Sequence, residues 1–124
     1  MKRIVLHVLS VCIIFLFFSG CNCASDSEIS LKASVSFNDG HFYIFNESTF
    51  VWYNVELILN YEEGNLSSGY GYKTGLILGI EDIIGSDFIN NEGMRFRYWK
   101  EEPIRLMISA ETEDGRVGTY IKEW

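Results

Sequence analysis

A strict alternation of apolar and polar side chains, beginning at Ile29, is the feature that most constrains the fold of this chain. From Ile29 to Phe37 every second residue is apolar, and the residues between them are serines and one lysine. A period of two is typical of a β-strand with one buried and one exposed face. Asn38-Asp39-Gly40 follows, and its Asp-Gly pair indicates a hairpin turn because both residues tolerate positive φ.

Short runs of apolar, β-branched and aromatic residues continue to the C-terminus and are separated by turn residues. The further strands predicted from these runs are 41–45, 50–59, 94–99, 104–110 and 117–122. Within 50–59 the alternation puts Val55 and Leu57 on one face and Trp52 on the other.

Two segments are ambiguous. Residues 61–75 are rich in glycine and tyrosine, and we predict a long loop with room for a short strand near 70–73. Residues 76–84 fit one bulged strand or two short ones, and the spacing of apolar residues over 81–88 also fits a short helix.

Seven or so short strands with regular turn signals favour an all-β fold. We predict a small antiparallel β-sandwich of about seven strands over residues 29–124. Two stretches within it are Phe42-Tyr43-Ile44-Phe45-Asn46 and Trp52-Tyr53-Asn54-Val55-Glu56-Leu57. Together they resemble the small immunoglobulin-like domains of bacterial envelope proteins. The resemblance implies an immunoglobulin-like sandwich and identifies no functional residue.

The first twenty residues have a different character. Lys2 and Arg3 precede an almost unbroken apolar run from Ile4 to Phe18. The run is shorter than the ~20 apolar residues that a membrane-spanning helix needs. A charged start, an apolar core and a small-residue exit are instead typical of a secretory signal peptide, which we predict for residues 1–20.

The end of this leader, Phe18-Ser19-Gly20-Cys21, resembles the lipobox of bacterial lipoproteins, although Phe18 stands where leucine is most common. The resemblance implies cleavage before Cys21, lipid attachment to Cys21, and a lipidated tether over residues 21–28. Acyl chains on Cys21 would hold the protein at a membrane. Asn22 favours the outer over the inner membrane, because aspartate at this position retains many Gram-negative lipoproteins in the inner membrane.

Two other fates of the leader stay open. Cleavage after Ala24 would release an ordinary secreted domain, and an uncleaved leader would itself be the anchor. Cys12 lies in the leader and Cys21 is the predicted lipid site, which leaves Cys23 as an expected free thiol. The fold therefore cannot depend on a disulfide framework.

The charge of the chain argues against nucleic-acid binding. The formal charge is −7 over 124 residues, and it becomes −9 when a leader containing Lys2 and Arg3 is removed. Such a chain repels phosphate backbones, and no run of basic residues offsets the repulsion.

Signals for catalysis or metal binding are weak. His41 is the only histidine outside the leader and directly follows a predicted turn. The acidic residues occur mainly as neighbours, and adjacent residues of a strand point to opposite faces, so they rarely converge on one substrate. These neighbours are Glu62-Glu63, Glu81-Asp82, Glu101-Glu102 and Glu113-Asp114. The sequence therefore predicts no metal, no cofactor and no enzymatic activity.

Aromatic residues are the best candidates for partner binding, because exposed rings stack on sugars or anchor protein partners. The candidates are Trp52, Tyr70, Tyr72, Tyr98 and Trp99. The alternative is that these rings line the core or shield sheet edges.

The favoured interpretation is a lipid-anchored, non-catalytic envelope protein that binds a protein or glycan partner or has a structural role. The alternative is a small secreted or envelope enzyme, or a protease inhibitor, whose active loop the sequence does not identify.

Overall fold

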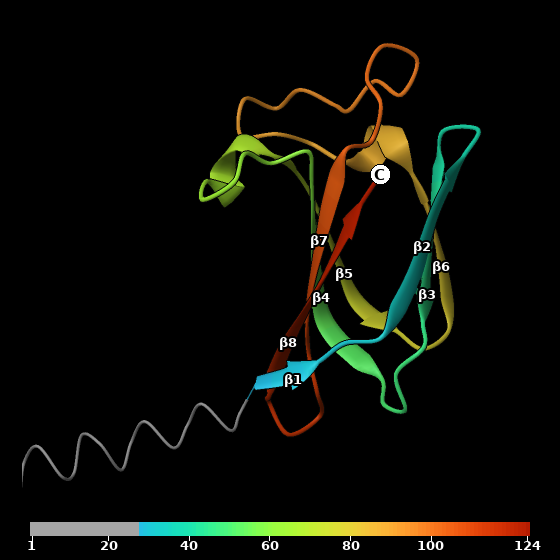
Figure 1. The fold of residues 1–124 in the computed structure, drawn as a ribbon, viewed down its shortest axis with the longest axis vertical. Coiled ribbons are helices and arrows are strands. Elements are labelled where there is room, and N and C mark those ends of the chain that lie inside the picture. The colour runs from blue at the N-terminus through green and yellow to red at the C-terminus, as the bar shows by residue number, and fades with distance from the viewer. Residues whose placement is uncertain (1–27) are drawn as a thin grey trace, which may run out of the picture.

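The computed structural model describes residues 28–124, so the predicted signal peptide, Cys21 and Cys23 lie outside the described residues. Eight strands form two sheets that face each other (Figure 1). The strands are β1 (Glu28–Ser30), β2 (Ala33–Asn38), β3 (His41–Asn46), β4 (Trp52–Leu59), β5 (Tyr70–Ile77), β6 (Ile80–Ile84), β7 (Arg105–Glu111) and β8 (Val117–Glu123). The predicted all-β sandwich is confirmed.

The larger sheet has the order β1-β8-β7-β4-β5 and the smaller one the order β2-β3-β6. Neighbouring strands run antiparallel except β1, which runs parallel to β8. The alternating stretch predicted as one strand is divided at Leu31 and Lys32, so that β1 joins the larger sheet and β2 the smaller. Asp39 and Gly40 have φ of 52° and 80° and form the predicted hairpin turn between β2 and β3.

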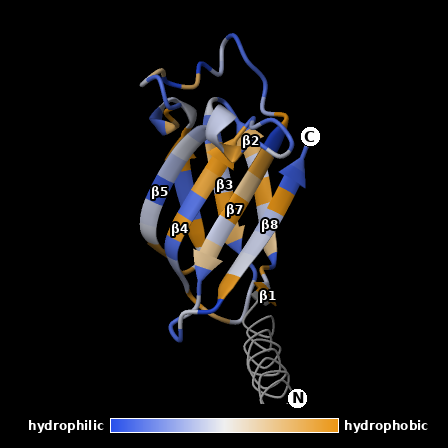
Figure 2. Ribbon diagram, turned by 90° about the vertical axis from the view of Figure 1, so that its left-hand side faces the viewer, coloured by the Kyte–Doolittle hydropathy of each residue, from blue (hydrophilic) through white to orange (hydrophobic). Residues whose placement is uncertain are grey.

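The core lies between the sheets. Apolar and polar bands alternate along the middle of β4 in Figure 2, as expected for a strand with one buried face. The largest fully buried side chains are Trp52, Phe42, Phe88, Phe96, Ile44 and Leu57. Phe88 and Phe96 come from the segment between β6 and β7, which closes one end of the sandwich.

Trp52 lies on the core face, and the predicted opposite face is wrong. The register between β4 and β7 shifts between Tyr53 and Glu56, and Asn54 within the shift has a φ of 47°. Such a bulge reverses the face on which the following side chains lie. Trp52 and Val55, three residues apart, are consequently both buried.

The predicted strand over 94–99 is also wrong. In this segment only an isolated bridge between Ile89 and Arg95 forms, and Phe96 alone is buried. The segment crosses the end of the sandwich, where no neighbouring strand is available to extend a ladder (Figure 1).

The ambiguous segments become strands. The loop predicted over 61–75 is shorter than expected, because β5 begins at Tyr70. This strand pairs with β4 along its whole length. Residues 80–84 form β6 rather than the start of a helix, and a single 3-10 turn, η3 (Gly85–Asp87), follows. A second 3-10 turn, η2 (Leu66–Ser68), lies between β4 and β5.

Candidate functional site

The five candidate aromatic residues fall into three environments. Trp52 is fully buried and therefore offers no surface to a partner. Tyr70 and Tyr72 are partly buried and pack against the core. Tyr98 and Trp99 are exposed over 42% and 62% of their surfaces, so only this neighbouring pair is available for binding.

Tyr98 and Trp99 lie at the tip of a tight turn, residues 97–100, which we call the aromatic turn. The backbone N–H groups of Lys100 and Glu101 both donate to the carbonyl of Arg97, each at 2.9 Å. The two rings meet edge to face, with centroids 5.1 Å apart and planes inclined at 86°. This arrangement is favourable for aromatic pairs and limits the freedom of both side chains.

The phenol ring of Tyr98 rests on the β2–β3 hairpin. A Cβ atom on Gly40 would lie 2.7 Å from the ring, closer than real Cβ contacts allow. Because Gly40 has no side chain, the Tyr98 ring packs directly on the backbone of the hairpin. The carbonyl of Gly40 in turn accepts from the N–H of Gly85 at 2.7 Å, which fixes the hairpin against η3.

Residues on both sides of the aromatic turn hold it to the core. Phe96 is buried and meets Tyr70 edge to face, with centroids 5.5 Å apart. The hydroxyl of Tyr70 donates to the carboxylate of Glu101, at 3.0 Å from the nearer oxygen. Burial and the negative charge of Glu101 raise the pKa of Tyr70 above 10.0, so this phenol stays a donor at neutral pH.

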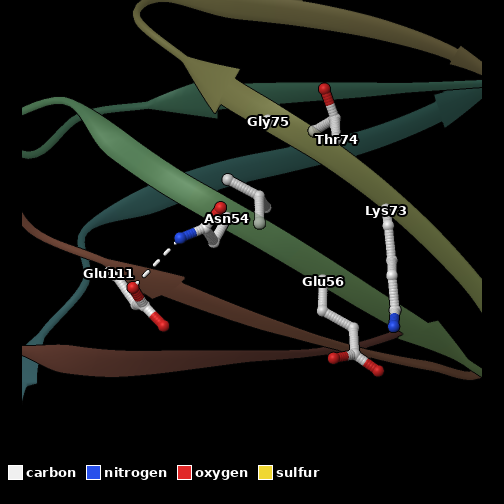
Figure 3. A pocket seen from close by; sticks show the side chains of 7 residues that line it. Asn54, Glu56, Lys73, Thr74, Gly75 and Glu111 are labelled. Carbon is white, nitrogen blue, oxygen red and sulfur yellow. Dashed lines mark hydrogen bonds between the residues drawn. The ribbon is translucent and has the colours of Figure 1, made fainter. Parts of the chain in front are cut away.

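A hollow of about 470 Å³ lies on the outer face of β4 and β5, and sequence reasoning missed it. Figure 3 shows Asn54 and Glu111 joined at one side of it, with Nδ2 of Asn54 donating to Oε2 of Glu111 at 3.1 Å. Glu56 and Lys73 line this hollow and also a second one of about 510 Å³ farther along the strands.

Two glycines of β5 account for the hollows. Gly71 and Gly75 belong to β5, which pairs with β4, and they lie on the same side of the strand as Lys73. A Cβ atom on Gly75 would have no neighbour within 4 Å. The alternation of glycine with polar residues from Gly69 to Gly75 was the sequence signal that could have indicated them.

The outer face of the smaller sheet is more apolar than the sequence pattern suggested. Tyr43, Phe45, Ile80 and Ile84 are exposed on β3 and β6, where Phe45 pairs with Ile80. Asp82 pairs with Tyr43 and lies between Ile80 and Ile84 on β6, so a charged side chain interrupts the apolar residues of this face. The alternation of β3 was visible in the sequence, but the adjacency of β6 was not.

His41 lies on the same face, paired with Ile84, and contacts one carboxylate. Its Nδ1 atom is 2.7 Å from Oδ1 of Asp82 on β6, and both side chains are substantially exposed. Within residues 28–124 no group of three or more histidine, cysteine or acidic side chains is arranged to hold a metal ion. The acidic neighbours Glu62-Glu63 and Glu113-Asp114 lie on turns at the surface.

Comparison with known proteins gives no match: no family model, no curated protein and no solved structure is similar to this chain. None of the helices in the described part of the chain is both long and apolar enough to span a membrane.

Proposed function

We propose that this chain is a lipid-anchored protein of the bacterial cell envelope whose β-sandwich binds a protein or glycan partner without catalysing a reaction. Anchoring rests on the resemblance of Phe18-Ser19-Gly20-Cys21 to a lipobox, with the lipid on Cys21 and the outer membrane favoured by Asn22. The acyl chains would make release from the membrane negligible.

The observation that carries the binding proposal is the exposed Tyr98–Trp99 pair. The aromatic turn lies at the top of Figure 1, and β1 lies at the bottom, where the described chain begins. A tether before Glu28 would therefore leave the aromatic turn facing away from the membrane. Rings held in place before binding lose little conformational freedom when a partner docks, which favours affinity.

We also infer an immunoglobulin-like connectivity. If β2 to β5 correspond to strands A, B, C and C′ and β6 to β8 to E, F and G, the smaller sheet has the order A-B-E. The larger sheet then has β1 at its edge, followed by G-F-C-C′. These are the neighbours expected in immunoglobulin-type sandwiches.

Anchoring is tested by intact mass measurement on the membrane fraction of cells that make the native chain or Cys21→Ser. We expect a native species that starts at Cys21 and carries added acyl mass, and no such species in the variant. A soluble native chain without acyl mass would contradict anchoring and support the secreted alternative.

Binding is tested in the same cells with the aromatic photo-crosslinker p-benzoylphenylalanine at position 99, where it keeps an exposed aromatic ring, and at position 113 as the control. Trp99 is in the aromatic turn, whereas Glu113 is exposed at the opposite end of the sandwich. We expect an envelope component to be captured from position 99 alone. Equal capture from both positions, or none from position 99, would contradict a binding role for the aromatic turn.

A further inference from the structure

Cationic side chains are concentrated around the aromatic turn. The whole chain has ten lysine and arginine residues against 17 acids, yet Arg95, Arg97 and Lys100 lie within six residues that contain no acid. Charges at a protein surface act over about 8 Å at physiological ionic strength. The local cluster therefore matters more to a ligand at this turn than the negative charge of the whole chain.

Two of these cations are not neutralised by an ion pair. Arg95 donates to the carbonyl of Ser86 at 3.0 Å and lies 3.7 Å from Asp87. Across residues 28–124, neither Arg97 nor Lys100 has a carboxylate within ion-pair distance. By their positions in the turn, they flank Tyr98 and Trp99 on either side.

Two acids, Glu101 and Glu102, directly follow the aromatic turn, and only the carboxylate of Glu101 has a side-chain contact among residues 28–124. The carboxylate of Glu101 accepts from the hydroxyl of Tyr70, on the core side of the turn. The backbone carbonyl of Glu102 accepts from Nδ2 of Asn60, which holds that residue against the end of β4. Asp39 lies in the hairpin beneath Tyr98, and Glu92 lies in the same segment between β6 and β7 as the aromatic turn.

We propose that the aromatic turn binds an anionic glycan, with a sugar ring on Trp99 and its acidic group between Arg97 and Lys100. The C–H face of a pyranose is apolar and flat enough to pack on an indole ring. Arginine matches a carboxylate or phosphate with two parallel hydrogen bonds, and lysine adds a point charge. The inference rests on the proposed function, because it names the partner of the same turn.

The size of the exposed surface favours a glycan over a protein. A stable protein interface covers about 800 Å² on each partner and has an apolar centre. The aromatic turn offers one indole and one phenol ring on a narrow projection, which matches one or two sugar units. The broader apolar face formed by Tyr43, Phe45, Ile80 and Ile84 lies on the smaller sheet and belongs to another surface.

The test measures binding of the full-length chain, purified in detergent, to two matched pairs of polymers. Polygalacturonate is compared with its neutral methyl ester, and phosphomannan with neutral mannan, so that carboxylate and phosphate are distinguished. We expect at least one acidic polymer to bind about tenfold or more tightly than its neutral counterpart, equivalent to one charge-assisted contact. Added salt should reduce this preference.

Three variants separate stacking from charge. Trp99→Ala should weaken binding of the acidic and neutral polymers by the same factor, about tenfold. Arg97→Gln with Lys100→Gln should abolish the preference for the acidic polymer and leave neutral binding unchanged. Lys73→Gln, which removes an exposed cation on β5, is the matched control and should have no effect. Unfolding midpoints of all variants verify that each is folded.

Several outcomes would overturn the glycan inference. These are equal binding of acidic and neutral polymers, no binding of either acidic polymer, or binding unaffected by Trp99→Ala. Binding to phosphatidylglycerol vesicles in preference to all four polymers would assign the aromatic turn to a lipid surface instead. If position 99 captures an envelope protein in cells and no glycan binds, the proposed function stands and the glycan inference fails. If position 99 captures nothing, both fail.

Discussion

The two ends of the sandwich are closed in different ways. The β1 end is closed by the short segments 47–51, 78–79 and 112–116, and beneath them lies the fully buried Trp52. The other end, which carries the aromatic turn, is closed by the long segment 85–104, and its Trp99 is largely exposed. Two tryptophans that the sequence presents as equivalent candidates thus have opposite exposure to solvent. The segment in which a ring lies therefore decides whether the ring is buried in the core or exposed to a partner.

Hydrogen bonding reinforces the contrast. Asn46 at the β1 end is only 6% exposed, and its amide donates to the carbonyls of Phe50 and Ile77 and accepts from the N–H of Ser48. Asn60 at the other end bonds similarly to the segment before β7, but it is partly exposed. Loss of a buried partner costs more, because water cannot replace it.

The largest difference in stability between the two ends should come from replacing each tryptophan separately by alanine. Trp52→Ala removes a fully buried ring and should lower the free energy of unfolding by about 3–5 kcal/mol. Trp99→Ala removes an exposed ring and should change it by less than about 0.5 kcal/mol. Denaturant unfolding followed by circular dichroism gives both values. Equal losses would mean that the two ends are not different.

The two asparagines provide the second test. Asn46→Ala leaves two buried carbonyls and one N–H without their partner, and should cost about 2–3 kcal/mol. Asn60→Gly keeps a residue that accepts the φ of 54° and removes only the side-chain bonds, so about 1 kcal/mol is expected. A larger loss at Asn60 would reverse the order proposed for the two ends.

A comparison of two turn glycines tests the contact between Gly40 and the Tyr98 ring. Gly40 and Gly115 have φ of 80° and 84°, so alanine at either should cost about 1 kcal/mol in backbone strain. Gly115 has no neighbour within 4 Å of a new Cβ atom, whereas Gly40 has the Tyr98 ring at 2.7 Å. We expect Gly40→Ala to lose about 1 kcal/mol more and to change the near-ultraviolet circular dichroism. Identical behaviour of the two variants would show that Tyr98 does not rest on the hairpin.

At alkaline pH the end with the aromatic turn should weaken. Burial and Glu101 raise the pKa of Tyr70 above 10.0, so the unfolded chain loses this proton at lower pH than the folded one. The stabilisation is complete below pH 10.0 and is lost as the pH rises through the folded pKa. Ultraviolet titration of the tyrosines should show a late-ionising phenol that is missing in Tyr70→Phe. Indistinguishable titrations would exclude the contact with Glu101.

At acid pH the β1 end should lose stability instead, and this loss should be the smallest of the predicted effects. The hydroxyl of Thr112, followed by Arg116, lowers the pKa of Asp114 below 3.8. Its contribution is present above that pH and is lost as the pH falls through the folded pKa. Carboxyl titration by nuclear magnetic resonance should find the pKa of Asp114 below 3.8, and Thr112→Val should return it toward 3.8.

The sequence predicted the elements with local signals. The Asp39-Gly40 hairpin and the alternation of β7 needed only a turn residue pair and a period of two. The bulge at Asn54, which turns Trp52 inward, depends on pairing with β7 more than fifty residues away in the chain. The same holds for 94–99, where alternating apolar residues form no strand because pairing with residues 88–90 is limited to one isolated bridge.

The candidate site was predicted in part. Tyr98 and Trp99 were named from their residue type, but the sequence did not separate them from the buried Trp52. The packing of the Tyr98 ring on Gly40 is a contact between segments far apart in the chain, which the sequence did not indicate. The hollow over β5 depends on which face of the strand Gly71 and Gly75 occupy. The prediction of a loop over 61–75 assigned these glycines to no face.

The parallel pairing of β1 with β8 has a mechanical consequence. If a tether holds the chain before Glu28 and a ligand holds the aromatic turn, tension acts along the strands of the sandwich (Figure 1). The pairs Glu28–Val117, Ile29–Gly118 and Ser30–Thr119 would then be loaded in shear. Their hydrogen bonds would resist together, where a peeling force would break them one at a time. The short first strand would act as a latch that must rupture as a unit before the domain can extend.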